Sequence, residues 1–247
     1  MIFMTLIFAH RGYRAKYPEN TMLAFKEAAE AGADGIELDV HMTKDKEIVV
    51  IHDETLDRTT NGKGYVKDYT LKELKELDAS IPKKRLFRSE EIPTLVEVLE
   101  WMKTNDLLLN IELKNDRIQY EGLEDKVIEL VRFFQMEDRV ILSSFNHYSL
   151  VYCNKKAPEI EIAALISQGL YEPWKYTKGI SAKAMHPHYL LAQKQIVEAS
   201  QRANIAVRPY TVNDEQLLEK MFSYNCDGVI TDEVERALDV RSRMIVM

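Results

Sequence analysis

Residues 6–40 read LIFAHRGYRAKYPENTMLAFKEAAEAGADGIELDV, and this stretch decides the fold class. An apolar run at 6–9 predicts a strand, and the pattern from Thr21 to Ala31 predicts an amphipathic helix that ends at Gly32. A second apolar strand follows at 36–40. Strands that alternate with helices in this way are typical of parallel α/β architecture, because each helix returns the chain to the start of the sheet.

The same alternation continues along the chain. Further strands are expected at 47–52, 107–113, 140–144, 161–166, 183–186, 205–210 and 228–231. Helix start signals lie between them, with Thr94 placed before Glu97 and Asn213 before Gln216 at the capping spacing. Nine strands are one more than a closed barrel needs, and the run at 47–52 is the extra one because it forms a hairpin. The sequence therefore predicts an α/β fold of the TIM (β/α)8 barrel type.

Length and composition are consistent with one large domain. The chain has 247 residues, of which 46% are hydrophobic, so residues 1–247 can share one large core. The charged and irregular stretch at 53–93 is expected to be a small insertion over the active-site mouth, because so long a loop is unusual in a compact barrel. The alternative is a solvated loop without function.

Charge and cysteine content exclude several classes of protein. The formal net charge is −7, and the basic residues are scattered, which argues against nucleic acid as a partner. Cys153 and Cys226 lie in no CxxC motif and indicate a reducing compartment, so a cytoplasmic location is expected. No apolar run is long enough to span a membrane, and the N-terminal run is interpreted as a strand rather than an export signal. The oligomeric state is left open.

Three acidic residues are candidates for a metal site. Glu37 and Asp39 occupy positions i and i+2 of one predicted strand, so their side chains point to the same face. Two hard oxygen donors at one point would bind Mg²⁺ or Ca²⁺. On this pattern alone, a sheet edge with both acids in water is an equal alternative. Glu112 adds a third carboxylate, although taken alone it is better explained by an ion pair with Lys114.

Two histidines at strand ends are candidates for proton transfer. His10 and His52 each close an apolar strand, and an imidazole can accept and return a proton near neutral pH. His41 shares the face of the acidic pair and is expected to be a hydrogen-bonded neighbour rather than a ligand. His186 and His188 are expected in a turn at the end of a strand rather than at the rim of the site.

A pairing argument places His52 near the acids. If the connection at 43–46 is an even loop, Met42 opposes Glu47 and Glu37 opposes His52 across the hairpin. An odd loop would shift the register by one residue and turn His52 away from the acids.

Several blocks of sequence can be compared with a known family. They are HRGYRAKYPENTMLAF, GIELDVHMTKDKEIVVIHDETLDRTTNGKG, IPTLVEVL, NIELK, SSFN, RPYTVN and GVITD. In these blocks the chain resembles the glycerophosphodiester phosphodiesterases. A lone HRG would be weak evidence, whereas HRG, PENT, ExD, HD and ExK in this order are highly specific.

The resemblance implies a TIM barrel with a small insertion after the HD block. It also implies that Glu37, Asp39 and Glu112 hold one divalent metal ion, which would be Mg²⁺, Ca²⁺ or Mn²⁺. His10 and His52 would act as general acid and base.

The resemblance further implies that Arg11 and Lys114 contact the phosphate, whereas Asn20 and Thr21 are expected to cap the first helix. The implied reaction converts a glycerophosphodiester, a small molecule, into glycerol 3-phosphate and an alcohol. A cyclic phosphate formed by the substrate's own 2-hydroxyl is the expected intermediate. One alternative is a lysophospholipase D-like phosphodiesterase, which needs an apolar track for an acyl chain. The other is a non-catalytic barrel that binds phosphoesters.

Overall fold

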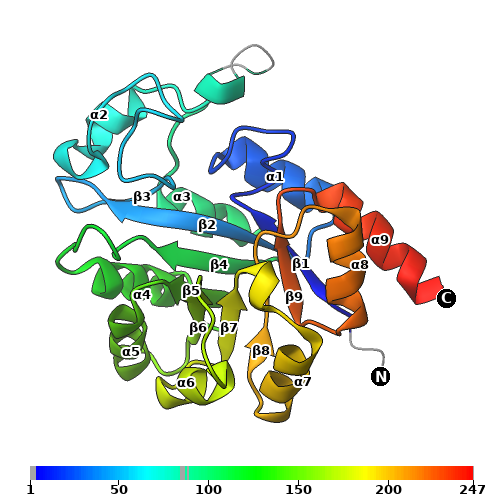
Figure 1. The fold of residues 1–247 in the computed structure, drawn as a ribbon. Helices are drawn as coiled ribbons and strands as arrows, with labels where there is room; N and C mark the ends of the chain where they lie inside the picture. Colours follow the sequence, from blue (N-terminus) through cyan, green and yellow to red (C-terminus); the bar gives the residue numbers. More distant parts are fainter. Residues whose placement is uncertain (1–3, 84–86, 88, 247) are drawn as a thin grey trace.

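The computed structural model describes residues 4–83, 87 and 89–246. Within these residues, eight parallel strands form a nearly closed barrel with helices on its outside (Figure 1), which confirms the predicted TIM barrel. The barrel strands are β1 (Leu6–His10), β2 (Gly35–Met42), β4 (Leu108–Leu113), β5 (Val140–Ser144), β6 (Glu161–Ile166), β7 (Ala184–Pro187), β8 (Ala206–Val207) and β9 (Gly228–Thr231). They are hydrogen-bonded in the order β8-β7-β6-β5-β4-β2-β1-β9. β8 and β9 meet through individual backbone bonds, including one from Asp227 N to Val207 O of 3.0 Å.

The helices cover the outer face of the sheet, where they pack against the outward side chains of the strands. They are α1 (Met22–Ala31), α3 (Leu95–Met102), α4 (Leu123–Phe133), α5 (His147–Lys156), α6 (Pro173–Gly179), α7 (Lys194–Arg202), α8 (Glu215–Ser223) and α9 (Val234–Val246), whereas α2 (Leu71–Lys75) lies in the segment between β3 and α3. In the described part of the chain, none of them combines the length and apolarity that crossing a bilayer requires.

Two of the predicted helix starts are confirmed. The Thr21 side chain accepts a hydrogen bond from Ala24 N at the start of α1, which ends at Gly32 with a φ of +92°. Thr94 and Glu97 form the reciprocal capping box of α3.

The predicted cap at Asn213 is wrong. Asp214 caps α8 by accepting from Leu217 N at 3.1 Å. The Asn213 side chain instead bonds to Asp232, because its Nδ2 donates to a carboxylate oxygen and its Oδ1 accepts from Asp232 N.

The barrel interior changes from apolar to polar along the strands. Its apolar part is built from small and large side chains, among them Phe8, Ala184 and Ile230. Gly35 provides room for Phe8, because a Cβ at Gly35 would lie 2.7 Å from the Phe8 ring. Two residues further along β1 and β2, the inward positions carry His10 and Glu37. The packed apolar layer therefore supports a polar mouth at the carboxyl ends of the strands, where the active sites of such barrels lie.

The hairpin exists, and of the two registers considered it has the one with an odd loop. β3 (Ile48–Val50) pairs antiparallel with β2, and Met42 lies opposite Ile48 instead of Glu47. The connection is an odd loop, closed by a bond from Thr43 N to Glu47 O of 2.9 Å. β3 ends at Val50, so His52 lies beyond the ladder and its direction is set by other contacts.

The segment between β3 and α3 has a small core of its own. It contains α2 and two short 3₁₀ turns, η1 (Val66–Asp68) and η2 (Ile81–Lys83). Its core consists of Val49, Ile51, Leu56, Val66, Leu74, Ala79 and Ile92. Lys83 Nζ donates to the carbonyl oxygens of Arg14 and Ala15 in the β1–α1 loop, so the segment is held against the loop that follows His10. It lies beside the β2–β3 hairpin in Figure 1.

Candidate active site

Three carboxylates converge at the mouth of the barrel. Glu37 and Asp39 come from β2 and Glu112 from β4, where Asp39 and Glu112 are register partners. One oxygen of each lies within 4.8 Å of the others, and all three side chains are buried. Their convergence is as predicted, and the alternative of a sheet edge with both β2 acids in water is wrong. The ion pair expected for Glu112 is also present, since Lys114 Nζ donates to its Oε1 at 2.9 Å.

The charge of this cluster is only partly balanced by protein groups. Burial, followed by the charges of Asp39 and Glu112, raises the pKa of Glu37 well above its usual range. Burial would also raise the pKa of Asp39, but nearby Arg11 is the strongest of several groups that lower it. Among the described residues, Asp39 Oδ1 has no hydrogen-bond partner. Buried carboxylate oxygens of this kind suit a divalent cation, so the cluster could hold a metal ion.

His10 is oriented by a carboxylate from the last barrel strand. Its Nδ1 lies 2.7 Å from Oδ1 of Asp232, which directly follows β9. Asn213 holds the other oxygen of Asp232 at 2.8 Å. An Nδ1–H that donates to Asp232 leaves Nε2 as the basic nitrogen of His10.

His52 has the same arrangement with its neighbour in sequence. Its Nδ1 lies 2.6 Å from Asp53 Oδ1, and its Nε2 lies 3.4 Å from Lys114 Nζ. Because Lys114 also bonds to Glu112, His52 lies beside the carboxylates even though the loop is odd, which was expected to turn it away.

His41 supports the site without entering it, as predicted. Its Nε2 donates to the His52 carbonyl oxygen at 3.1 Å, and its Nδ1 accepts from Tyr120 Oη at 2.8 Å. Burial, as the largest cause, lowers the pKa of His41 to about 4, so the ring is neutral at physiological pH.

Arg11 connects the first loop to the carboxylates. It has a φ of +55°, and its backbone N donates to Glu37 Oε2 at 2.9 Å. Its guanidinium Nε lies 3.4 Å from Asp39. Asn20 was expected to act as a cap, which is wrong, because its Nδ2 donates to Asp39 Oδ2 at 2.9 Å. Thr21 alone caps α1.

Two further histidines, His186 and His188, lie outside this cluster. His186 is fully buried within β7, so its prediction as a turn residue is wrong. His188 follows β7 and caps the 3₁₀ turn η3 (Tyr189–Leu191), as expected for a turn.

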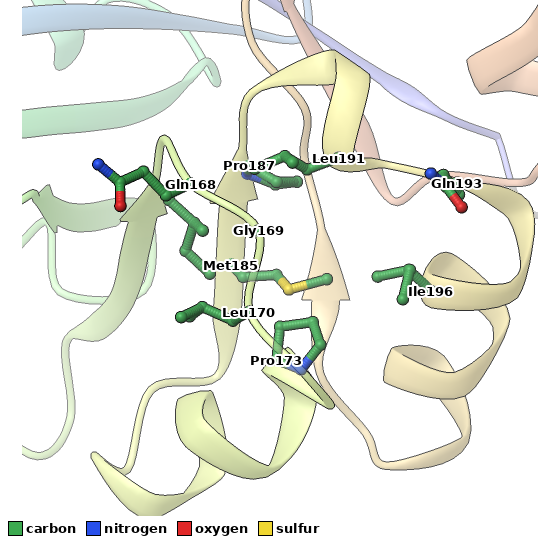
Figure 2. A pocket seen from close by; sticks show the side chains of 10 residues that line it. Gln168, Gly169, Leu170, Pro173, Met185, Pro187, Leu191, Gln193 and Ile196 are labelled. Carbon is green, nitrogen blue, oxygen red and sulfur yellow. The ribbon is translucent and has the colours of Figure 1, made fainter.

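A separate apolar pocket lies on the outer side of β7 (Figure 2). It has a volume of about 150 Å³ and is formed where the loops before α6 and α7 meet. Its lining includes Leu170, Met185, Pro187, Leu191 and Ile196. None of the predicted metal, phosphate or proton-transfer residues lines it.

Comparison with known proteins agrees with this geometry. The model of the glycerophosphoryl diester phosphodiesterase family matches residues 10–236. The chain belongs to this family. A glycerophosphodiester phosphodiesterase of Caldanaerobacter subterraneus subsp. tengcongensis is 47% identical over 96% of this chain and 97% of its own. A glycerophosphodiester phosphodiesterase of Bacillus altitudinis is 48% identical over 98% of this chain and 100% of its own. This relationship confirms the predicted enzyme class.

A solved structure of the same kind extends the comparison. A phosphodiesterase of Oleispira antarctica, in complex with the product sn-glycerol-3-phosphate, superposes with a TM-score of 0.89 at 31% identity. The match covers 97% of this chain and 98% of that chain.

Sequence reasoning missed the two carboxylates that orient the histidines in this phosphodiesterase-family chain. Asp53 was visible in the HD block, directly after His52, but its bond to the ring was not foreseen. Asp232 stands in the GVITD block, far in sequence from His10. Only the pairing of β1 with β9 brings these two residues together.

Removal of one buried charge should stabilise the metal-free protein. The pKa of Glu37 is raised in the folded state, so its stabilising contribution is present at low pH and is lost as the pH rises through the folded pKa. At neutral pH and without metal, Glu37→Gln should raise the free energy of unfolding by about 1 kcal/mol or more, since one pKa unit corresponds to about 1.4 kcal/mol. Urea denaturation in chelator measures this.

The exposed Glu235 provides the control, because Glu235→Gln removes an equal charge at the surface. Added Mg²⁺, Mn²⁺ or Ca²⁺ should raise the free energy of unfolding of the unaltered protein more than that of the Glu37→Gln variant. A variant that is less stable than the unaltered protein in chelator would contradict the predicted repulsion among the carboxylates.

Proposed function

We propose that this protein is a metal-dependent hydrolase that converts glycerophosphodiesters into glycerol 3-phosphate and an alcohol. The observation that carries the proposal is the buried carboxylate cluster flanked by His10 and His52, each bonded through Nδ1 to an aspartate. The product bound to the Oleispira relative supports the same substrate class. The insertion at 53–93 would act as part of one domain spanning residues 1–247.

Glu37, Asp39 and Glu112 would hold one divalent ion, either Mg²⁺ or Ca²⁺, with Mn²⁺ as a further candidate. Two observations support this: Asp39 Oδ1 accepts no hydrogen bond and has only Lys114 Nζ at 3.9 Å, and burial, followed by the neighbouring carboxylates, raises the pKa of Glu37. A bound ion would supply positive charge that stabilises the phosphate oxygens as the phosphorus is attacked.

The protein's own basic residues would act on the same phosphate. Lys114 is buried and Arg11 is largely buried at the mouth, and each lies within 4 Å of Asp39. Their charges would stabilise the additional negative charge of the transition state.

His10 and His52 would transfer the protons. Each donates Nδ1–H to an aspartate, so each presents Nε2 for proton transfer. One histidine would deprotonate the substrate's 2-hydroxyl, whose oxygen attacks phosphorus. The other would protonate the alcohol oxygen as its bond to phosphorus breaks. The resulting cyclic phosphate would then be opened by water, with the two roles reversed.

A lysophospholipase D-like activity is the second candidate, favoured by the apolar pocket of Figure 2. Leu170, Leu191 and Ile196 give this pocket the apolar surface that an acyl chain requires. It lies beside the carboxyl ends of β6 and β7, on the outer side of the barrel wall, so an acyl chain would have to pass over the rim to reach it.

The setting of the reaction follows from surface charge and cysteine state. The net charge of −7 supports a small-molecule substrate rather than nucleic acid. Cys153 and Cys226 are buried free thiols, which supports a reducing cytoplasmic location.

A substrate panel tests the function directly. Purified protein should release glycerol 3-phosphate from glycerophosphocholine or glycerophosphoethanolamine, lose this activity after chelation, and recover it with Mg²⁺, Mn²⁺ or Ca²⁺. Faster cleavage of monomeric lysophosphatidylcholine would favour the second candidate. Full activity after rigorous metal removal would refute metal dependence, and inactivity on every diester would refute the function.

The two histidines should be separable from residues that only bind. His10→Ala and His52→Ala should each lower kcat by about 10²-fold or more, because positioned proton transfer typically contributes that much. Calorimetric metal affinity should stay unchanged. His147→Ala is the control, since His147 bonds Tyr176 and the Leu165 carbonyl outside the carboxylate cluster. A near-native kcat for either site variant would assign that histidine a structural role.

The nucleophile can be tested with a modified substrate. A 2-deoxy glycerophosphodiester should bind through its phosphate but resist cleavage, because the tethered hydroxyl supplies the high effective concentration on which the step depends. ³¹P NMR of slow variants with the normal substrate should show the cyclic phosphate. Cleavage of the 2-deoxy analogue at the rate of the natural diester would point to direct attack by water.

A further inference from the structure

Glu19 accepts hydrogen bonds from arginines of different segments. Its Oε1 accepts from Arg11 Nη1 and from Arg58 Nη2, both at 2.8 Å, and its Oε2 accepts from Arg58 Nη1 at 3.0 Å. Arg14 Nη2 lies 3.5 Å from the same Oε2. Only 10% of the Glu19 side chain is exposed, so this carboxylate is largely buried among guanidinium groups.

Arg58 joins Glu19 to the carboxylate that orients His52. Its Nε donates to Asp53 Oδ2 at 2.6 Å and its Nη2 to Asp53 Oδ1 at 3.1 Å. The Arg58 guanidinium thus donates two hydrogen bonds to Glu19 and two to Asp53. Only arginine has the planar fork that allows this, and a lysine could not reproduce it.

A second and weaker series of contacts leads from Glu19 toward His10. Arg14 lies between Glu19 and Asp232, with Nη1 at 3.6 Å from Asp232 Oδ1. Asp232 orients His10, so alternating charges connect the two histidine–aspartate pairs. The Arg14 contacts are long and its side chain is 30% exposed, so they hold Asp232 less firmly than the Arg58 contacts hold Asp53.

The charge on Glu19 is retained because of these partners. Burial alone would raise the pKa of Glu19, but the hydrogen bond from Arg58 and the charges of Arg11 and Arg14 lower it to about 2. Without this anion, Arg11 and Arg58 would lose a shared partner, and each would be free to turn toward other carboxylates of the mouth.

We propose that Glu19 is a positioning residue that holds Arg11 in place for the phosphate and, through Arg58, holds Asp53 so that His52 keeps its Nδ1 proton. The catalytic part of this inference rests on the proposed function. The competing explanation is that Glu19 and Arg58 only fasten the insertion to the β1–α1 loop.

Kinetics of a double-mutant cycle separate these explanations. Glu19→Gln should lower kcat/KM by about 10- to 100-fold, the usual scale for the outer partners of site residues. Its KM should rise because Arg11 is released, whereas Arg58→Lys should lower mainly kcat. If the two residues act through each other, the double variant should be little worse than Glu19→Gln.

Glu235→Gln is the matched control. Glu235 accepts from Lys16 of the same β1–α1 loop at 2.6 Å, but the pair is more than half exposed. This variant should keep kcat and KM. If the loss of kcat/KM in the double variant equals the product of the two single losses, the proposal is overturned in favour of the fastening role. The same holds if the losses of activity follow the loss of folded protein in thermal unfolding.

A spectroscopic readout makes the test independent of activity. Long-range ¹H–¹⁵N NMR at alkaline pH should find the His52 proton on Nδ1 in the unaltered protein, and part of it on Nε2 in Glu19→Gln and Arg58→Lys. His10 should change less, because Asn213 also holds Asp232. An unchanged His52 tautomer in both variants would overturn the proposal. A tautomer shift in a protein inactive on every diester would instead leave the positioning intact and refute the proposed function. Arg58 is 43% exposed, so Arg58→Lys keeps the test available if Glu19→Gln fails to fold.

Discussion

The burial of negative charge on β2 at the mouth of the barrel is the constraint on which the rest of the site depends. Glu37 and Asp39 point into the barrel mouth, where Glu112 joins them from β4. Buried carboxylates require compensation. The protein supplies it in part through Lys114 and through the backbone N of Arg11, which adopts a positive φ to reach Glu37. The remaining charge favours a divalent ion.

The barrel makes this unfavourable cluster possible because its lower interior is well packed. Phe8 and its apolar neighbours fill the space beneath the mouth, and Gly35 leaves room for the Phe8 ring. Polar groups are concentrated above this layer. The stability of the fold and the chemistry of the site thus occupy different halves of the same strands, as is usual for such barrels.

The site is also held from outside by charge pairs that cross segment boundaries. His10 is bound by an aspartate after the last barrel strand, and His52 by the aspartate that follows it in the chain. Arg58 brings the insertion into contact with Glu19 in the first loop. The insertion therefore contributes Arg58 directly to the surroundings of His52, and it has a small apolar core of its own.

The sequence alone determined what depends on local periodicity. Alternation along one strand is sufficient to place Glu37 and Asp39 on one face, and the spacing of polar caps located α1 and α3. Strand ends also marked Glu112, His10 and His52 as candidates, and the family motifs joined them to the β2 pair as one expected site. Local patterns could not predict the odd loop of the hairpin, because one residue reverses every facing position. They also could not pair His10 with Asp232 or turn Asn20 toward Asp39. Only tertiary structure decided these contacts, because they arise when the barrel brings the first and last strands together and folds the first loop over its mouth.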